Sequence, residues 1–397
     1  MKKKKYRVKI IPMNETLLNC SDKGYEALDV QHCNENLQFR YRFTQEEQYV
    51  VLLQIQEDGV WTNCCELRVY SVKPDYFKLR PYRGDMHCHT CRSDGKEGPA
   101  IVAANYRKSG FDFLSITDHG QYELRRRQSG HFRISRMSFQ LFAGEEVHPP
   151  KNNCHTVHFG GTYSINQIFR EDPEKYEREV DEIENKLEIP EGLNTREYAS
   201  LLWVYRNIRE AGGMAIMAHP CWIQDEAYHI RRDMYRYLLQ THPFDALELT
   251  CGQSLEENQL QISLWQQMRE EGNVVPVVGS SDSHGTVNSP WFGLSKMIVL
   301  SEECTKDALI DAVKARRAVV LEQYPGEPLP RVYGENRALE FVLFLVTEYM
   351  PLHDELCFEE GRLMKAYACG DQEAGEELRR IGKRTDFLTE KYWAKEV

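Results

Sequence analysis

The sequence predicts an α/β protein in which a (β/α) barrel lies between a small β-rich module and a mainly helical extension. Between residues 81 and 300, short apolar segments alternate with helical stretches, which is typical of βα units around parallel strands. Nearly every one of these apolar segments ends on a His, Asp or Glu. Because barrel enzymes assemble their active sites at the carboxyl ends of the strands, this regularity also predicts where a site lies.

Residues 1–80 are predicted to form the β-rich module. Residues 37–43, LQFRYRF, alternate cleanly between apolar and polar side chains, and residues 49–56, YVVLLQIQ, are rich in strand-forming types. Glu57, Asp58 and Gly59 supply the turn that follows. No cluster of catalytic residue types occurs here. The module is expected to cover one end of the barrel or to mediate self-association.

Residues 81–300 are predicted to form the barrel, and three helices are expected between its strands, at residues 98–109, 195–211 and 255–271. The segment 171–192 interrupts this pattern. It is highly charged, with Val180, Ile183 and Leu187 at helical spacing. A solvent-exposed helical insertion is the favoured interpretation, and a lid or a dimerisation arm is the alternative.

Residues 301–397 are predicted to form the C-terminal extension, mainly helical. Residues 305–321, TKDALIDAVKARRAVVL, indicate a helix that runs into a strand. Residues 339–350, LEFVLFLVTEYM, fit either a strand or a buried helix, and their periodicity does not decide between the two.

The composition is that of a soluble globular protein, with 41% hydrophobic and 28% charged residues. The net charge of −11 argues against broad, phosphate-driven binding, so no long nucleic acid is expected as a partner. Four lysines follow Met1, but neither the apolar stretch of a signal peptide nor a membrane-spanning run develops. We therefore expect a cytoplasmic protein with reduced cysteines and no membrane partner.

The candidate metal ligands occur in motifs at the strand ends. The segment GDMHCHT places two histidines one residue apart, and GSSDSH repeats this spacing with an aspartate and a histidine. Since alternate residues of a strand share a face, each pair can converge on one ion. The full set is His87, His89, Asp94, Asp118, His119, Glu146, His155, His219, Asp282 and His284. Imidazole and carboxylate suit zinc, manganese and iron, and a site with several ions needs about eight or nine such ligands.

In this order, the motifs GDMHCHTCRSDG, SITDHG, FAGEEV, AHP and GSSDSH resemble the polymerase-and-histidinol-phosphatase (PHP) superfamily of metal-dependent hydrolases. The preceding β module and the following AVKARRAVV helix look like the branch that includes carbamate-ester hydrolases. The resemblance is weak over residues 1–80 and over the last part of the chain. It implies a distorted seven-stranded (β/α) barrel with two or three divalent metal ions, zinc, manganese or iron, in its mouth.

By motif, the resemblance assigns His87, His89, Asp282 and a bridging Glu146 to a first metal, Glu146, His155 and His219 to a second, and Asp94, His119 and His284 to a third. The family's Gly-x-acid spacing favours Glu146 over Glu145. The distance to Gly160 favours His155 over His158. Asp118 is expected to orient a ligand histidine, and direct ligation is the alternative.

The resemblance and the residue types predict a metal-dependent hydrolase that cleaves a small phosphate ester, with a metal-bridged hydroxide as the nucleophile. His87, His89, Glu146 and Asp282 are the predicted catalytic centre, supported by Asp118. The expected partner is a small phosphorylated molecule.

Arg125 and Arg126 belong to an arginine-rich stretch after the second barrel strand. Guanidinium groups bind phosphate in a bidentate manner, so these two residues are the candidate substrate ligands. A solvent-exposed basic helix face is an equally favoured interpretation.

Three other functions fit the same sequence. A carbamate or carboxylic ester hydrolase would use the same metals, and so would a phosphodiesterase that acts on a small phosphodiester or nucleotide. A metal-stabilised binding domain without turnover belongs to a different class. The presence of a suitable residue at every expected ligand position argues against that last alternative.

Overall fold

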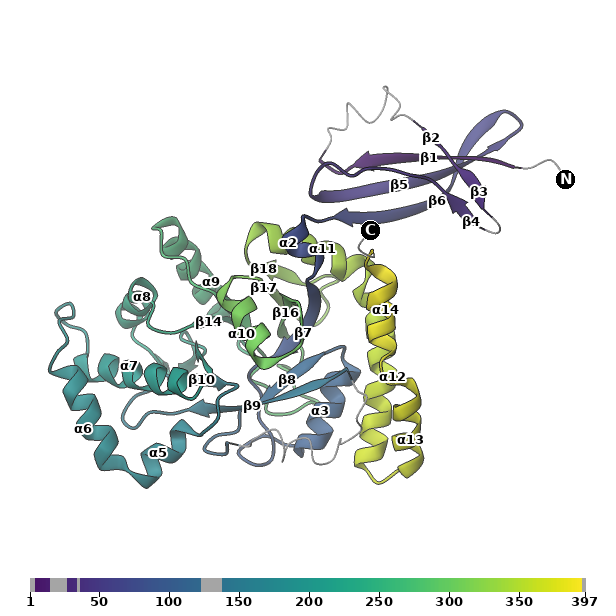
Figure 1. The fold of residues 1–397 in the computed structure, drawn as a ribbon. Coiled ribbons are helices and arrows are strands. Elements are labelled where there is room, and N and C mark those ends of the chain that lie inside the picture. The colour runs from purple at the N-terminus through teal and green to yellow at the C-terminus, as the bar shows by residue number, and fades with distance from the viewer. Residues whose placement is uncertain (1–3, 15–26, 34–35, 123–137, 395–397) are drawn as a thin grey trace. The chain divides into compact units, whose positions relative to one another are not determined.

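The computed structural model describes residues 4–14, 27–33, 36–122 and 138–394, which divide into two compact units (Figure 1). The smaller unit contains the residues up to Leu79 together with Glu340–Tyr349. The larger unit contains Arg80–Leu339 and the residues from Met350 onward.

The smaller unit is an antiparallel sheet in the order β2-β1-β5-β6. Its strands are β1 (Lys5–Pro12), β2 (Leu28–Asp29), β5 (Glu47–Glu57) and β6 (Val60–Ser71), with a separate hairpin of β3 (Gln31–Cys33) and β4 (Asn36–Gln38) and a short helix α2 (Pro74–Phe77). The predicted turn joins β5 to β6. Val8, Ile10, Tyr49 and Val51 form the core of this unit, so the β-rich character expected here is observed.

The strand predicted at residues 37–43 is wrong beyond its first two residues, which belong to β4. Phe43 instead packs its ring against Tyr49, with the ring centroids 4.8 Å apart, and Tyr41 packs against Phe43 at 5.0 Å. The alternating aromatic side chains of this segment therefore pack on the sheet and do not extend it.

The larger unit is built on a ten-stranded sheet in the order β15-β14-β11-β10-β9-β8-β7-β16-β17-β18. Its strands are β7 (Arg80–Asp85), β8 (Phe113–Ile116), β9 (Gln140–Val147), β10 (Thr156–Phe159), β11 (Met214–Met217), β14 (Ala246–Thr250), β15 (Val277–Gly279), β16 (Ser295–Ser301), β17 (Ala318–Glu322) and β18 (Arg331–Tyr333). A small hairpin of β12 (Ile223–Gln224) and β13 (Ala227–Tyr228) lies outside it. The predicted α/β class is confirmed.

Strand β10 departs from the predicted parallel arrangement. The pairs β7–β8, β8–β9, β11–β14 and β14–β15 are parallel, but β10 runs antiparallel to both β9 and β11. The segment 148–155 joins β9 to β10 without a helix, and a parallel crossover needs a dozen or more residues. As a result, the start of β10 lies at the edge where the parallel strands end.

The segments that follow β7 and β15, the first and last strands in parallel pairs, contact each other. Cys88, after β7, forms a bridge with Ser283, after β15. The His89 N–H donates to the Ser283 carbonyl and the Asp282 N–H donates to the His87 carbonyl, both at 2.9 Å. The sheet therefore curls until the two histidine-containing motifs touch.

The boundary predicted at residue 300, between the barrel and the C-terminal extension, lies within a strand of the ten-stranded sheet. Strand β16 contains that residue and pairs with β7, and β17 and β18 continue the same sheet. A helix that runs into a strand was correctly expected here. The strand, β17, belongs to the same sheet, and its Val319 and Val320 are buried. The strand count of seven stays a prediction.

The helices follow the sequence closely. The three predicted between strands are α3 (Pro99–Lys108), α7 (Thr195–Glu210) and α9 (Leu255–Glu270), and α10 (Lys306–Lys314) precedes β17. Ser254 and Glu257 form a capping box at the start of α9, which satisfies two otherwise unpaired N–H groups. The remaining helices of this part are α5 (Ile165–Glu171), α6 (Pro173–Glu184) and α8 (Arg232–Thr241). None of the described helices is both long and apolar enough to cross a bilayer.

The charged segment 171–192 is largely the helix α6, as the favoured interpretation expected. It is exposed over most of its length, but Tyr176 and Val180 are buried in the main core. Tyr176 also shares a hydrogen bond of 2.9 Å with Ser200 of α7. In this structure α6 is therefore attached to α7 along one side.

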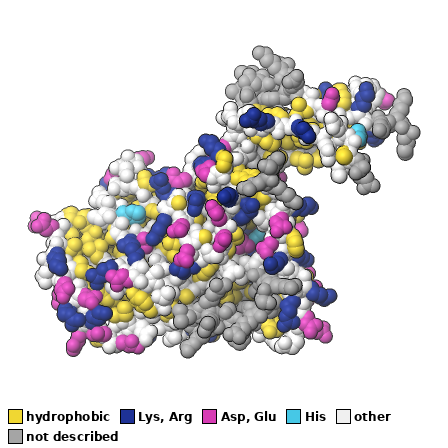
Figure 2. All heavy atoms as spheres, viewed as in Figure 1, with side chains coloured by type: hydrophobic (Ala, Val, Ile, Leu, Met, Phe, Trp, Pro, Cys, Tyr) yellow, Lys and Arg dark blue, Asp and Glu magenta, His cyan; other side chains and the backbone are white. Residues whose placement is uncertain are grey.

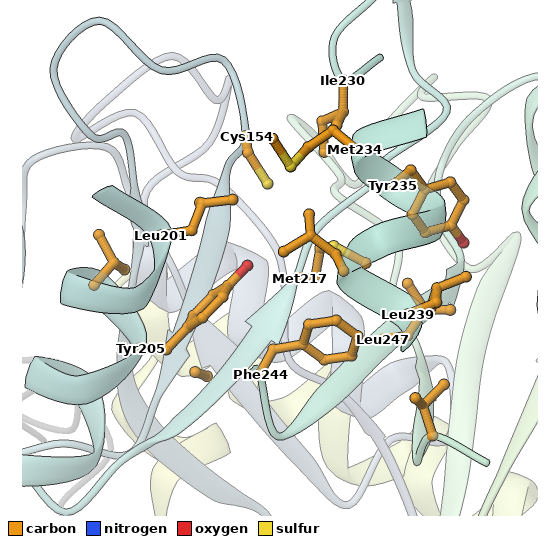
Figure 3. Close-up of a cluster of buried hydrophobic side chains, with 14 of the residues drawn as sticks. Cys154, Leu201, Tyr205, Met217, Ile230, Met234, Tyr235, Leu239, Phe244 and Leu247 are labelled. Carbon is orange, nitrogen blue, oxygen red and sulfur yellow. The ribbon is translucent and has the colours of Figure 1, made fainter. Parts of the chain in front are cut away.

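Helices α7 and α8 cover the sheet through one large apolar cluster (Figure 3). Figure 3 shows Leu201 and Tyr205 of α7 facing Met217 of β11, with the side chains of α8 and Leu247 of β14 beside them. A fully buried side chain of this kind contributes about 1.5–3 kcal/mol relative to leaving it exposed. This core holds the strands whose ends form the site.

The C-terminal part is helical, as predicted: α11 (Asn336–Glu348), α12 (Met350–Ala368), α13 (Gln372–Ile381) and α14 (Arg384–Tyr392). The ambiguous segment 339–350 is thus a helix for most of its length. Helix α12 lies beside α3 (Figure 1). Between them, Arg107 of α3 pairs with Glu360 of α12 and with Asp112, and His353 Nε2 of α12 donates to Asp112 at 2.8 Å.

This buried network predicts a pH profile of stability. Burial opposes the charge of Asp112, but His353 and Arg107 lower its pKa to about 2. Burial alone would lower the pKa of His353, but Asp112 and Cys357 raise it well above its usual value. With unfolded pKa values of about 3.9 and 6.5, the stabilisation from Asp112 is lost as the pH falls from about 4 towards 2. The stabilisation from His353 is complete below about pH 6.5 and is lost as the pH rises through its folded pKa.

Urea unfolding at a series of pH values checks this profile. We expect the free energy of unfolding to decline above about pH 6.5 in the wild type, and His353→Gln to flatten that alkaline decline. The same alkaline slope in both proteins would contradict the role given to His353.

Candidate metal centre

The structure gathers all nine predicted metal ligands at one edge of the ten-stranded sheet. They lie after β7 (His87, His89 and Asp94), after β8 (His119), within β9 (Glu146), before β10 (His155), after β11 (His219) and after β15 (Asp282 and His284). The antiparallel direction of β10 is the reason why a residue at a strand start joins residues at strand ends.

The first group consists of His87, His89, Glu146 and Asp282. The Nε2 atoms of His87 and His89 both lie 3.3 Å from Glu146 Oε2, and they lie 3.2 Å and 3.0 Å from Asp282 Oδ1. Ligands placed 2.0–2.1 Å from a tetrahedral ion are roughly 3.3 Å apart. The spacing of these four atoms therefore fits a single ion.

The second group uses the other oxygen of Glu146. His155 Nδ1 lies 2.8 Å and His219 Nε2 lies 3.0 Å from Glu146 Oε1. One buried carboxylate thus faces the first group with one oxygen and the second group with the other, which is the geometry of a bridging ligand.

The third group is centred on Asp94. His119 Nε2 and His284 Nε2 lie 3.3 Å and 3.2 Å from Asp94 Oδ2. His119 Nδ1 also lies 3.3 Å from Glu146 Oε2, and His89 Nδ1 lies 3.6 Å from Asp94 Oδ1. The third group is therefore adjacent to the first, and its Asp94 is the most exposed of the nine residues, at 50% of its side chain.

The ligand atoms of the cluster are better placed to bind a metal ion than to form hydrogen bonds with one another. Six of them are shielded from solvent yet have no hydrogen-bond partner of acceptable geometry among the described residues: His87 Nε2, His89 Nδ1 and Nε2, His119 Nδ1, His155 Nδ1 and Asp282 Oδ1. An unsatisfied buried polar group costs about 1–3 kcal/mol. So many unsatisfied polar atoms in one place indicate that they bind a common ion. Imidazole and carboxylate together are ligands for zinc, manganese or iron.

The protonation states of the residues in the cluster also favour metal binding. Burial opposes the charge of Glu146, but His87 and His155 hold its pKa well below its usual value. Burial lowers the pKa of His119 and of His155 to about 4, so both rings are neutral at pH 7 and free to ligate. The neighbouring carboxylates Asp282 and Glu146 overcome burial at His89 and raise its pKa to about 9. Metal binding at neutral pH must therefore release a proton from this ring.

Two of the gathered residues have unusual backbones. His219 has φ 27° and Asp282 has φ 46°, both in the left-handed region. Residues other than glycine rarely adopt it, and such strain is concentrated at functional sites. The strain turns both side chains into the cluster immediately after their strands.

The structure separates the paired alternatives. Glu145 points away from the cluster and accepts hydrogen bonds from Ser164 Oγ at 2.7 Å and from the Ile165 N–H at 2.5 Å, at the start of α5. His158 lies beside Glu145, 3.3 Å away, and is also outside the cluster. The residues brought together are Glu146 and His155.

Among the residues that the structure describes, the hydrogen bonds of Asp118 go to a loop and not, as expected, to a ligand histidine. Its oxygens accept from the Thr90 N–H at 2.7 Å and from the hydroxyls of Thr90 and Ser93 at 2.6 Å. Because these residues belong to the loop between His89 and Asp94, Asp118 fixes the loop that connects the first and third groups. Arg125 and Arg126, the predicted phosphate ligands, lie outside the described residues.

Two further residues contact the cluster. His148 follows Glu146 by two residues in the chain, its Nε2 lies 3.6 Å from Glu146 Oε2, and its ring stacks on that of His155 at 3.7 Å. Its side chain is 42% exposed, so it lies on the open side. Glu248 is fully buried on the other side of His87. The i, i+2 spacing could have indicated His148, whereas no sequence signal distinguishes Glu248 from other strand residues.

Comparison with known proteins adds the following. No family model matches the chain. The DNA polymerase/3'-5' exonuclease PolX of Bacillus subtilis is 35% identical over 57 residues. That match takes in 14% of this chain and 10% of the polymerase, so the chain corresponds to a small part of its length.

Three solved structures resemble the larger part of the chain. A two-domain protein from Bacteroides vulgatus, which contains a predicted PHP-like metal-dependent phosphoesterase, is 16% identical, with a TM-score of 0.41 over 61% of this chain and 65% of that one. A protein from Bifidobacterium adolescentis assigned as a metal-dependent phosphoesterase is 19% identical, with a TM-score of 0.36 over 58% and 95% of the two chains. An amidohydrolase from Chromobacterium violaceum, with bound sulfate and no metal, is 18% identical, with a TM-score of 0.34 over 51% and 87%. The carbamate-ester branch is not among these matches.

Proposed function

We propose that this protein is a metal-dependent phosphoesterase that hydrolyses a small phosphate ester at a centre of two or three divalent ions. The observation that carries the proposal is the convergence on Glu146. Its two oxygens face two separate sets of ligand atoms, at distances of 2.8–3.3 Å. Adjacent ions held in this way can activate water for the hydrolysis of a phosphate ester.

Bound ions of this kind acidify water and neutralise charge on the attacked phosphoryl group. The protein's own part is to hold the ligand atoms in place: Glu146 keeps the two groups adjacent, and Asp118 holds the loop that carries Asp94. The two buried thiols near the centre, those of Cys88 and Cys251, do not offer an alternative nucleophile. Burial raises the pKa of Cys88 and of Cys251 well above the usual value, so both remain protonated at neutral pH.

The proposal of a small phosphorylated substrate as the partner is supported by the charge of the protein. Figure 2 shows acidic and basic side chains interspersed over the visible face, and the net charge is −11. Such a surface supports a small phosphorylated substrate over a long nucleic acid. A cytoplasmic location, the absence of a membrane partner and self-association remain predictions from the sequence.

A small phosphodiester is the second candidate substrate. The local match to PolX favours it, because that protein is named as an exonuclease, an activity that cleaves phosphodiester bonds. The carbamate or carboxylic ester alternative would use the same metal groups but has no comparable support.

A panel of p-nitrophenyl substrates tests the proposal. We expect metal-reconstituted protein at pH 7–9, with manganese or zinc, to hydrolyse p-nitrophenyl phosphate faster than bis-p-nitrophenyl phosphate and p-nitrophenyl acetate. Asp282→Asn should abolish the activity, because it removes the negative charge of a ligand in the first group, whereas Glu145→Gln should retain it. Preference for the diester would establish the second candidate, and cleavage of the acetate alone would overturn the phosphoesterase assignment.

A further inference from the structure

Glu248 is a fully buried carboxylate of β14 that touches two of the three ligand groups without belonging to any of them. Its Oε1 lies 3.0 Å from His87 Nδ1. Its Oε2 accepts a hydrogen bond of 2.9 Å from the backbone N–H of His219. The side chains of Glu248 and His87 are both fully buried.

The contact with His87 determines which ring nitrogen carries the proton. An ionised carboxylate can only accept hydrogen bonds, so the proton of a neutral His87 ring must be on Nδ1. The lone pair of Nε2 is then directed at the first group, where Glu146 Oε2 and Asp282 Oδ1 lie 3.3 Å and 3.2 Å away. This is the tautomer that can ligate a metal there.

Glu248 also accepts a hydrogen bond from the backbone of His219 and so holds it in place. His219 has the strained φ of 27°, and its N–H is held by Glu248 while its Nε2 reaches Glu146 Oε1 in the second group. The backbone of Glu248 is fixed in turn, because Gln261 of α9 donates to the carbonyl of Glu248 at 3.3 Å and to that of Leu249 at 3.1 Å.

We infer that Glu248 is a positioning residue of the metal centre, which sets the tautomer of His87 and the backbone of His219 and so supports the first and second groups together. The inference rests on the proposed function only in that the cluster binds metal, and not on the substrate.

Glu248→Gln separates this role from simple packing, because the side chain keeps its shape. The His219 N–H needs an acceptor, so the amide oxygen must face His219 and the NH2 group must face His87. His87 Nδ1 then becomes an acceptor and its proton moves to Nε2, where it blocks metal binding. The matched control is Glu145→Gln, since Glu145 is an equally buried carboxylate beside a histidine, His158, outside the cluster.

Zinc or manganese affinity, measured by competition with a chromophoric chelator at fixed pH, is the readout. We expect Glu248→Gln to weaken metal binding about 10–100-fold, with hydrolysis partly recovered at high metal concentration, and Glu145→Gln to bind like the wild type. Equal affinity in all three proteins would overturn the inference. If the wild type binds metal but cleaves no phosphate ester, the proposed function fails while the affinity comparison still decides the role of Glu248.

A second measurement does not depend on the stability of a variant. In metal-free wild-type protein at a pH where His87 is neutral, the ¹⁵N shifts of its ring should show a protonated Nδ1 and an unprotonated Nε2, with the signals assigned by their loss in His87→Gln. A ring protonated at Nε2 would contradict the inference.

Discussion

Glu146→Gln is expected to lower the hydrolytic rate roughly a thousandfold or more, because loss of several kcal/mol of charge stabilisation by metal corresponds to about three factors of ten. The reason is that Glu146 is the only residue of the cluster whose two oxygens face both the first and the second groups. An amide has one acceptor oxygen and no charge, so it cannot replace the shared carboxylate. Rates should be compared at saturating substrate, together with the metal content of each preparation.

The control for this variant is Glu145→Gln, the neighbouring residue in the chain. Glu145 is equally buried, but its hydrogen bonds go to Ser164 and Ile165 at the start of α5. We expect it to keep metal content and activity and to lose some stability. Wild-type metal content and activity in Glu146→Gln would contradict the geometry assigned to the centre.

The largest expected effect on stability is that of Arg107→Ala. The Arg107 side chain is fully buried and its guanidinium contacts Asp112 at 2.9 Å, Glu360 at 2.7 Å and Thr385 at 3.2 Å. Removing it leaves the carboxylate of Glu360 buried without its cation and leaves Asp112 with His353 alone. Loss of one partner of a buried ion pair typically costs about 3–5 kcal/mol. Chemical denaturation should therefore show a large decrease in the free energy of unfolding.

An exposed arginine provides the comparison. Arg206 of α7 pairs with Glu179 at 3.1 Å, but 46% of its side chain is exposed. Solvent screening reduces such a pair to about 0–1 kcal/mol, so Arg206→Ala should change stability little. Similar losses in the two variants would show that burial of the Arg107 network is not what stabilises the attachment of α12 and α14 to α3.

Much of this architecture could be predicted because it depends on local patterns. Helices α3, α7 and α9 begin and end within a residue or two of their predicted bounds, since each has an apolar face and a recognisable start. The candidate ligands could be found for a similar reason. The strands that carry them are short, apolar and interrupted by His, Asp or Glu at the position where they end.

The features that could not be predicted depend on contacts distant in sequence. The direction of β10 follows from how the segment 148–155 turns back on β9, and alternation is the same for either direction. The role of Asp118 depends on where the Thr90–Ser93 loop lies. Glu248 belongs to an ordinary buried strand, and only the packing of β14 beside β11 brings it to His87 and His219.

That the sheet continues past residue 300, the predicted end of the barrel, could not be predicted for a related reason. Strand β16 forms its pairs with β7, more than two hundred positions earlier in the sequence, and β17 and β18 are added next to it. A change in the rhythm of strands and helices at this point therefore marks the end of the βα repeats and not the end of the sheet.

Elemental analysis of the purified protein, stripped with a chelator and reloaded with zinc or manganese, tests the central claim most directly. If the cluster around Glu146 is a metal centre, the wild type will bind two or three ions per chain, and Glu146→Gln will bind clearly fewer. Less than one ion per chain in the folded wild type, as judged by its far-UV circular dichroism, would contradict the metal centre and the proposed hydrolase with it.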